Sequence, residues 1–512
     1  MDFPLRKFKF KQQGFYFWQL LKIKELQVDS IHMDKIGVYV ATEQKGFLIA
    51  LAYQFEKKFN FKVTIIASDK YVYRLAKKIL PSDSEIVVIN YNKLLVDMEN
   101  FASIFQEAKR IEDDYGVKLS MLMSEDRALG QGYLSNVQKV PGIKRAWWSH
   151  EKKTREIVID IVKKEKLFKQ FNIAIQMWPN KISTMIYQKF DIAYFSLIPI
   201  KFGDRVFWSD NEFITGSRYI DRLNKYKVIC DNKDTIEYEI NRRTEKINKS
   251  AKYTYIAAVN KAIKIIINDS KNFIRGINKK DSYYYLGWLP SVFRSVHNYN
   301  YVKKNSVTFD NLSEYKVIFL TLHMEPEVAL QSLSPEFNNS MEIITWISKS
   351  LPVNYIIVVK EQANSYAVRS KWYYKQLIKM PNVVLSHPDL HSWKWIKFSD
   401  IVATITGTVG QEAVHFEKPV ISFGRHQVIN HLPTVYYASN YSETNKVINR
   451  IIQNPPSKND YSKSRVALSN AQLESSIDIP EYKNTFKSVN LETSMASKAL
   501  SHLVSEYPNI FK

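Results

Sequence analysis

The sequence predicts an α/β protein made of two doubly wound domains that face a cleft. Its 512 residues exceed what one hydrophobic core usually organises, so we expect two domains of roughly 200 residues each. Two series of short apolar runs alternate with stretches of helical periodicity, which is typical of parallel strands joined by helices. One of the last apolar runs leads into a turn with two glycines, at the edge where such sheets bind ligands.

The first series of expected strands and helices begins at Ile36. A helix is expected after the first strand, where Leu48, Leu51, Ala52 and Phe55 share one face. A second helix is expected where Leu94, Met98, Phe101, Phe105 and Ala108 recur at intervals of three or four. The strand candidates are IGVYVA at 36–41, VTIIA at 63–67, EIVVIN at 85–90, LSMLM at 119–123, NIAIQM at 172–177 and DIAYFSL at 191–197.

The second series follows a charged, helix-prone connecting region. Its strand candidates are KVIFLTL at 316–322, YIIVVK at 355–360, VVLSH at 383–387, DIVATIT at 400–406 and PVISFG at 419–424. The predicted divisions are a first domain at 1–220, the connecting region at 221–312, a second domain at 313–445, and helices packing across the cleft at 446–512.

An apolar stripe at helical spacing lies in the connecting region. It comprises Ile256, Val259, Ile263, Ile266 and Ile267. A helix at a membrane surface and a helix packed on its own domain both produce this pattern, and we favour the packed helix.

Charge and composition limit the choice of function. The formal net charge of +22 predicts attraction to phosphates, anionic lipids or acidic glycans without choosing among them. Cys230 is the single cysteine, which excludes a disulfide framework or a cysteine-rich metal site within one chain. No apolar run reaches the roughly 18 residues of a membrane span, and no signal peptide is evident. We therefore expect a cytoplasmic protein.

The run TITGTVGQEAVHFEKPVISFG at 404–424 carries the clearest chemical signal. Gly407 and Gly410 allow the backbone to approach a ligand, and Thr406 and Thr408 offer hydroxyls where a helix begins. Glu412, one turn into that helix, could accept hydrogen bonds from a ribose diol. An ordinary tight turn with a first-turn glutamate is the alternative.

These residues resemble the donor-site signature of GT-B glycosyltransferases, in particular the capsule polysaccharide biosynthesis family, which includes Kdo-transferase-like proteins. The matching residues are Thr406 to Thr408, Glu412 with Ala413, Lys418 to Ile421, and Gly424. The resemblance covers about Lys316 to Tyr441, and elsewhere it rests on the order of elements. It implies a GT-B fold with two Rossmann-like domains, the first for the acceptor and the second for the nucleotide-sugar donor.

The resemblance also implies further donor contacts. Similar proteins carry a Lys-Glu-His-Pro-like stretch, of which Lys360 and Glu361 are present here while the His-Pro pair is missing. A His-Pro pair occurs later, at His387 and Pro388, in what we read as a loop. Arg425 is a further candidate for the donor phosphates. The donor is a substrate, with a CMP-linked acidic sugar as one option, and neither a cofactor nor a metal is expected.

The acceptor half offers candidate catalytic residues at strand ends. Glu125, Asp126 or Glu43 could be the general base, and Arg127 could bind a carboxylate or phosphate. An ion-paired turn is the alternative reading of residues 125–127. His150 could donate to a developing phosphate charge. Trp208 could line the acceptor site, although tryptophan is more often a core residue.

The predicted function is transfer of a sugar from a nucleotide sugar to a growing or lipid-linked surface polysaccharide, in capsule or related glycan biosynthesis. One alternative is a polyol-phosphate transferase of teichoic-acid type. Such enzymes carry a sequence similar to Asp-Tyr-Ser-Ser at the position where this chain has Thr-Gly-Thr. A non-catalytic basic protein that binds membranes or nucleic acid is the other. The expected partners are the nucleotide sugar, a glycan acceptor, and an anionic membrane or other assembly proteins. No nucleic acid is expected, because the basic residues form no clear stripe.

Overall fold

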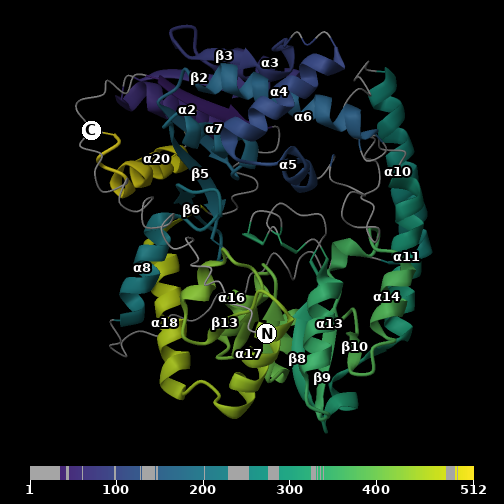
Figure 1. Ribbon diagram of the computed structural model, residues 1–512. Helices are drawn as coiled ribbons and strands as arrows, with labels where there is room; N and C mark the ends of the chain where they lie inside the picture. Colours follow the sequence, from purple (N-terminus) through teal and green to yellow (C-terminus); the bar gives the residue numbers. More distant parts are fainter. Residues whose placement is uncertain are drawn as a thin grey trace, which may run out of the picture. The chain divides into compact units, whose positions relative to one another are not determined.

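The computed structural model shows two sheets within the compact unit of residues 35–512 (Figure 1). The residues that it describes are 35–41, 45–59, 61–96, 98, 100–126, 129, 145, 148–200, 202–228, 253–274, 288–323, 330, 333, 334, 336, 337, 339–479, 490–492 and 494–511.

The first sheet has the strand order β14-β6-β5-β4-β1-β2-β3. Its parallel strands are β1 (Lys35–Val40), β2 (Lys62–Ala67), β3 (Val87–Asn90), β4 (Ile173–Met177) and β5 (Ala193–Pro199). At one edge β6 (Arg205–Ser209) and β14 (Ser476–Asp478) pair in antiparallel fashion. The chain winds outward from β1 toward β3 and then from β4 toward β6, so the winding reverses between β1 and β4. Such a reversal opens a crevice at the carboxyl ends of the strands.

Helices separate these strands along the chain. They are α2 (Lys45–Phe59), α3 (Lys70–Ile79), α4 (Phe101–Tyr115), α5 (Leu119–Glu125), α6 (His150–Phe168), α7 (Lys181–Lys189) and α8 (Ser217–Val228). Side-chain caps fix several of their starts: Asn100 caps α4, Ser149 caps α6 and Asn180 caps α7.

The second sheet is parallel throughout and has the order β13-β12-β11-β8-β9-β10-β7. Along β8, Val317 and Phe319 enter one hydrophobic core while Ile318 and Leu320 enter another, so both faces of the sheet are buried. The winding reverses between β8 and β11. The strands are β7 (Ser306–Val307), β8 (Lys316–Thr321), β9 (Tyr355–Lys360), β10 (Val383–Ser386), β11 (Ile401–Thr404), β12 (Val420–Ser422) and β13 (Val435–Tyr437).

The remaining helices flank this sheet or return to the first. They are α10 (Tyr255–Ile274), α11 (Leu289–Lys304), α13 (Ser340–Ser350), α14 (Lys371–Leu377), α15 (Ser392–Phe398), α16 (Val409–His415), α17 (Tyr441–Gln453), α18 (Lys458–Glu474) and α20 (Ser494–Glu506). Two doubly wound, Rossmann-like sheets confirm the predicted α/β fold class.

Two predictions of local structure were wrong. Residues 119–123 were predicted as a strand and form α5, in which Leu119, Leu122 and Met123 are buried at helical spacing. Five residues are too few to distinguish the alternation of a strand from the periodicity of a helix. The helix predicted from Leu94 begins only at Phe101, and its buried residues are Ile104, Ala108 and Ile111 instead of Phe105.

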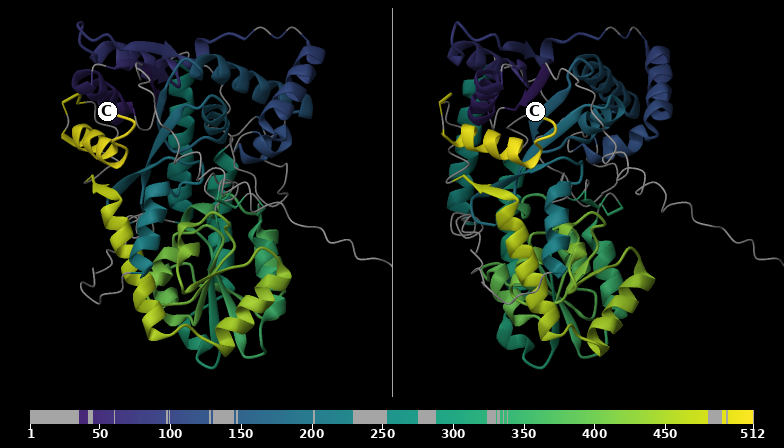
Figure 2. Two further views of the ribbon diagram at one scale, coloured as in Figure 1. Left: turned by 60° about the vertical axis from the view of Figure 1, so that its left-hand side comes forward. Right: turned by 90° about the vertical axis from the view of Figure 1, so that its left-hand side faces the viewer.

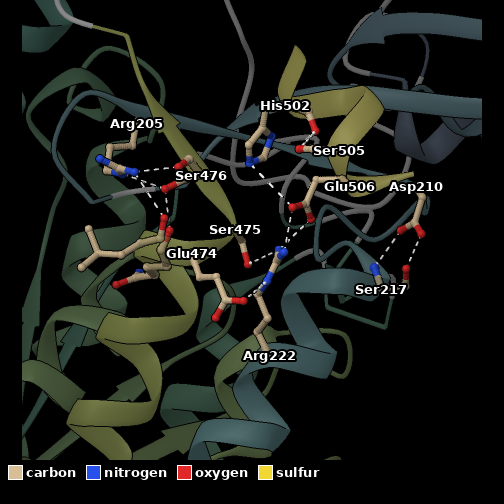
Figure 3. A network of polar contacts seen from close by, with 12 residues as sticks. Arg205, Asp210, Ser217, Arg222, Glu474, Ser475, Ser476, His502, Ser505 and Glu506 are labelled. Atoms are coloured by element: carbon tan, nitrogen blue, oxygen red, sulfur yellow. Dashed lines mark hydrogen bonds and ion pairs between the residues drawn. The ribbon is translucent and has the colours of Figure 1, made fainter. Parts of the chain in front are cut away.

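The carboxyl-terminal segment returns to the first sheet. Helix α18 packs along α8, β14 adds to β6, and α20 packs against α2 (Figure 2). Polar contacts hold this return (Figure 3): Arg222 of α8 makes two 2.7 Å bonds to the carboxylate of Glu506 and lies 3.2 Å from that of Glu474. Arg205 of β6 bonds the carbonyl of Ser476 at 2.6 Å. The strand and both helices of the tail are thus joined to β6 and α8.

Replacing Arg222 should measurably lower the free energy of unfolding. Arg222→Met leaves the carboxylate of Glu506, whose side chain is 10% exposed, without its bidentate partner, at a cost of about 2 kcal/mol. Lys57→Met is the matched control, because Lys57 and Asp83 form a surface pair with side chains 48% and 71% exposed, and should cost less than about 1 kcal/mol. Urea unfolding of the two variants checks this, and equal costs would contradict it.

Candidate active site

A cavity of about 660 Å³ lies at the carboxyl ends of strands from both sheets. From the first sheet it is lined by Ala41 after β1 and Trp178 after β4, with Glu125 and Lys181 beside them. From the second sheet it is lined by Thr406 and Thr408, which follow β11. The turn that the sequence singled out therefore opens onto a cavity shared with the first sheet.

Internal hydrogen bonds hold the backbone of this turn. The amide of Thr406 donates to Nε2 of His323 at 3.0 Å, and the amide of Gly407 donates to the hydroxyl of Thr404 at 2.9 Å. These two amides are therefore not bare, contrary to the expected phosphate cradle. The amides of Thr408 and Val409 find no acceptor in the part of the chain that the structure describes. Of the amides at this turn, those of Thr408 and Val409 are therefore the ones left for a ligand.

His323 stabilises the turn by accepting the hydrogen bond from the Thr406 amide, and the sequence analysis did not identify it as a site residue. It follows β8, is 2% exposed, and burial lowers its pKa to about 3, with Arg369 contributing. A neutral imidazole that accepts a hydrogen bond at Nε2 carries its proton on Nδ1. The lone histidine after an apolar strand was the available signal.

The hydroxyl of Thr406 adds an unsatisfied polar group. Its Oγ1 is buried and has no hydrogen-bond partner among the described residues. Buried hydroxyls normally have a partner, so a buried one at a cavity wall suits a ligand. Thr408 beside it is exposed. Both threonines line the cavity, Thr406 with a buried hydroxyl and Thr408 with an exposed side chain.

The glycines of this segment serve close packing within the protein. A Cβ on Gly410 would lie 2.7 Å from Cδ1 of Ile429, and one on Gly424 would lie 2.4 Å from the carbonyl oxygen of Ile405. At Gly407 the nearest atom would be the Thr404 hydroxyl, at 2.9 Å. Glycine at these positions lets the turn pack on its own support, while the expected approach of a ligand to Gly407 and Gly410 stays a prediction.

Glu412 lies in α16 but not on the cavity wall, which its neighbour Gln411 lines instead. Burial raises the pKa of Glu412 to about 7, against a smaller lowering by a hydrogen bond with Thr408. Glu412 therefore does not line the cavity, where the sequence analysis expected it to contact a ribose.

The Lys-Glu pair at the end of β9 is buried beside the second sheet. Glu361 is 5% exposed and bonds Arg369 at 2.6 Å and the hydroxyl of Tyr374 at 2.8 Å, which corrects its assignment to the donor. Lys360 is also buried, and its ammonium donates to the carbonyl of Pro388 at 3.2 Å. Burial lowers the pKa of Lys360 to about 8. Neither residue lines the cavity.

Arg425 likewise lies off the cavity wall. Its side chain is 58% exposed and is 3.4 Å from the carboxylate of Glu336. The next residue, His426, stacks on Phe213, with ring centroids 3.7 Å apart.

Glu125 and Asp126 both line the cavity, as predicted for residues at the acceptor side. Lys181 bonds Glu125 at 2.9 Å, so the ion-paired alternative also holds for Glu125. Burial raises the pKa of Glu125, Lys181 opposes the rise, and Glu212 adds to it. Burial also raises the pKa of Glu212, again opposed by Lys181. Two carboxyl groups therefore compete for one ammonium group.

Lys181, Glu212 and Lys164 are residues that sequence reasoning missed. Lys164 lines the cavity from α6 and bonds Asp160 at 2.8 Å and the side-chain oxygen of Asn180 at 3.2 Å. The hydroxyl of Tyr91 bonds Asp160 at 2.6 Å. The pair Asn180-Lys181, which follows strand β4, is the sequence feature that could have indicated this part of the cavity wall.

Two residues of the cavity wall have left-handed backbone angles. Trp178 has φ of 66° and Ile214 has φ of 59°. For side chains of this kind the conformation costs on the order of 1–3 kcal/mol, and such residues concentrate at functional sites. The surrounding contacts must therefore hold the loops after β4 and β6 in these conformations.

The other predicted residues lie elsewhere. Trp208 is a core residue, 3% exposed, whose indole N–H donates to the carbonyl of Ala499 at 3.0 Å, so its predicted acceptor role is corrected. His150 begins α6, is exposed, and is not part of the cavity wall. Glu43 and Arg127 lie outside the described residues.

The described residues contain neither a cluster suited to a metal ion nor a helix suited to span a membrane. Within the described ranges, three or more His, Cys, Asp or Glu residues nowhere gather closely enough to hold a metal ion. Of the helices in that same part of the chain, none is long and apolar enough to cross a membrane.

Comparisons with known proteins give structural matches only. No family model and no curated protein matches the sequence. Among solved structures, a putative UDP-N-acetylglucosamine 2-epimerase from Listeria monocytogenes covers 94% of this chain and 98% of its own, with 11% identity and a TM-score of 0.26. The KpsC β-Kdo 2,7 transferase from Thermosulfurimonas dismutans covers 67% and 89%, with 15% identity and a TM-score of 0.32. A glycosyltransferase from Rickettsia africae covers 94% and 100%, with 12% identity and a TM-score of 0.32.

Glu412 should make stability depend on pH. Its pKa rises from 4.5 in the unfolded chain to about 7 in the folded protein, so the folded state binds more protons between these values and stability falls as pH rises through them. Glu412→Gln should therefore be more stable than wild type by about 1–2 kcal/mol at pH 8 and equal to it at pH 4. Urea unfolding at both pH values measures the difference, and a pH-independent difference would contradict the assignment.

Proposed function

We propose that this protein is a GT-B glycosyltransferase that moves a sugar from a nucleotide-sugar donor to a surface-glycan acceptor in capsule or related polysaccharide biosynthesis. One observation carries the proposal: a single cavity has the Thr406–Thr408 turn of the second sheet on one wall and the Glu125–Lys181 pair of the first on another. A transferase needs this arrangement, because the anomeric carbon must lie between a leaving phosphate and an acceptor hydroxyl.

The donor binds with its phosphates at the turn after β11. The free amides of Thr408 and Val409, with the hydroxyls of Thr406 and Thr408, stabilise the negative charge that develops on the leaving phosphate. Gln427, also on the wall, holds the turn through a hydrogen bond to the carbonyl of Ile405. Because His323 and Thr404 fix the backbone beforehand, little reorganisation is required on binding.

The acceptor binds on the first-sheet side, with Glu125 as the general base. Its carboxylate takes the proton of an acceptor hydroxyl, the oxygen forms a bond to the anomeric carbon, and the bond from that carbon to the phosphate oxygen breaks. A raised pKa makes the carboxylate a stronger base. Lys181 orients it, and Asp126 is the second carboxylate within the same wall.

The finer points of the proposal follow the sequence resemblance. They are a CMP-linked acidic sugar as donor, a growing or lipid-linked glycan as acceptor, a reaction without a divalent metal, and action in the cytoplasm. Activity that is unchanged by EDTA supports the metal-independent reaction, and loss of activity that Mg²⁺ or Mn²⁺ restores would reject it. A donor preference for CDP-linked polyols would favour the teichoic-acid-type alternative.

A panel of nucleotide sugars tests donor binding. The correct donor should raise the melting temperature, since a ligand that binds only the folded state stabilises it with the logarithm of its concentration. Thr408→Val should weaken that donor about tenfold by calorimetry, because a hydrogen bond to a charged group is lost. Thr64→Val on β2, away from the cavity wall, is the matched control and should bind as wild type does. Equal binding by both variants would reject the donor site.

Glu125→Gln separates the chemical step from binding. We expect kcat for sugar transfer to fall by about 10²–10⁴-fold while donor affinity stays unchanged, because the amide cannot accept the proton. Glu107→Gln removes a carboxylate that pairs with Arg110 on α4, outside the cavity wall, and should leave kcat within about twofold. A Glu125→Gln enzyme with wild-type kcat would reject Glu125 as the base.

A further inference from the structure

Helix α10 presents an apolar stripe that no described part of the chain covers. Ile256 is 76% exposed, and Val259, Ile263, Ile266 and Ile267 are 45–49% exposed. The sequence analysis favoured packing of this stripe on its own domain, and that preference was wrong. The packed face is a different one, formed by Ala258, Ala262 and Ile265, and Ala258 and Ile265 belong to one apolar cluster with Val292 and Val296 of α11. Helix α10 packs against α11 (Figure 1).

The stripe is continuous along the helix. Positions 256, 259, 263, 266 and 267 recur at intervals that keep them on one side of an α-helix, while 258, 262 and 265 define the side toward α11. Single exposed apolar residues are normal on a protein surface, but five on one helical face form a contiguous patch. A patch of this kind requires a partner surface.

Positive charge borders the stripe. Lys261, Lys264 and Lys271 are exposed and fall on a third strip of the helix, between the stripe and the packed face. Asp269 is the single acidic residue in the α10 sequence. The adjacent α11 carries Arg294, Lys303 and Lys304 and no acidic residue, although Lys303 bonds Asp389.

We propose that α10 lies in the plane of a membrane surface rich in anionic phospholipids, with its apolar stripe in the boundary between headgroups and acyl chains. Isoleucine side chains replace water contacts with acyl-chain contacts, while the lysines stay at the level of the phosphates. Each lysine near an anionic surface adds attraction that salt weakens. The net charge of +22 brings the chain to the same surface. The proposal is independent of what the cavity binds.

An apolar stripe with a flank of lysines fits an anionic membrane better than it fits the surface of another protein. A partner protein or second copy that covers an isoleucine stripe has no need for a flank with lysines and almost no acidic residues, unless it is itself strongly acidic. A second copy is not, since this chain carries 73 basic against 51 acidic residues. Like charges opposite one another would oppose such self-association. Charge complementarity therefore favours the anionic membrane.

Sedimentation of the full chain with vesicles tests the proposal. Wild type should bind vesicles of equal parts phosphatidylglycerol and phosphatidylcholine and bind pure phosphatidylcholine at least about tenfold more weakly. Ile263→Glu with Ile267→Glu should reduce binding to the anionic vesicles at least about tenfold. Val353→Glu, at a residue 98% exposed outside the stripe, is the control for an added charge and should change binding little.

A second set of variants separates α10 from the general charge of the protein. Lys261→Gln, Lys264→Gln and Lys271→Gln together should weaken anionic-vesicle binding more than Lys70→Gln, Lys77→Gln and Lys78→Gln on α3, which remove the same charge from exposed positions. All these positions are exposed, so circular dichroism should show unchanged folding. Equal losses from both triples, or wild-type binding by the isoleucine variant, would overturn the proposal. So would a wild-type dimer that the isoleucine variant converts to monomer without any vesicle binding.

Discussion

The hydrogen bond from the Thr406 amide to the buried ring of His323 and the one from the Gly407 amide to the hydroxyl of Thr404 hold the turn on which the proposed donor site depends. These two bonds use up backbone donors that a ligand would otherwise meet, and in return they fix the turn after β11 before any ligand arrives. Gly407, Gly410 and Gly424 permit the close contacts that this support requires. Hydrogen-bond donors on a turn that is fixed in advance can stabilise developing negative charge without the cost of reorganising during the reaction.

The opposite wall of the cavity is organised by charge. Lys181 pairs with Glu125 and opposes the rise in the pKa of Glu212, and a second lysine, Lys164, bonds Asp160 and Asn180. Because each ammonium group already has a carboxylate partner, the wall is polar without a large net charge. Trp178 and Ile214 bring left-handed backbone angles to the same wall. The geometry suits a site that positions a hydroxyl beside a base better than one that only attracts anions.

The sequence predicted the fold better than the site. Alternating apolar runs identified most strands, because parallel strands buried on both faces differ clearly from amphipathic helices. The segment 119–123 is too short to show whether its apolar residues follow the period of a strand or of a helix. The edge strands β7, β13 and β14 have only two or three residues, which is too few for a recognisable pattern. Thr406, Thr408, Glu125 and Asp126 all line the cavity described above, although Glu125 ends helix α5 and does not follow a strand. Glu361 was not recognisable as buried, because only folding brings Arg369 to it. His323 and Lys181 were missed for the same reason. For Trp208 the core alternative given in the sequence analysis is the one observed.

The most direct measurement is a crystal structure of the protein with a bound nucleotide sugar or with the nucleotide that it releases. The account predicts a phosphate oxygen within hydrogen-bonding distance of the Thr408 amide and of at least one of the two threonine hydroxyls, with the sugar directed toward Glu125. A nucleotide bound elsewhere, or a phosphate that contacts neither Thr406 nor Thr408, would contradict it.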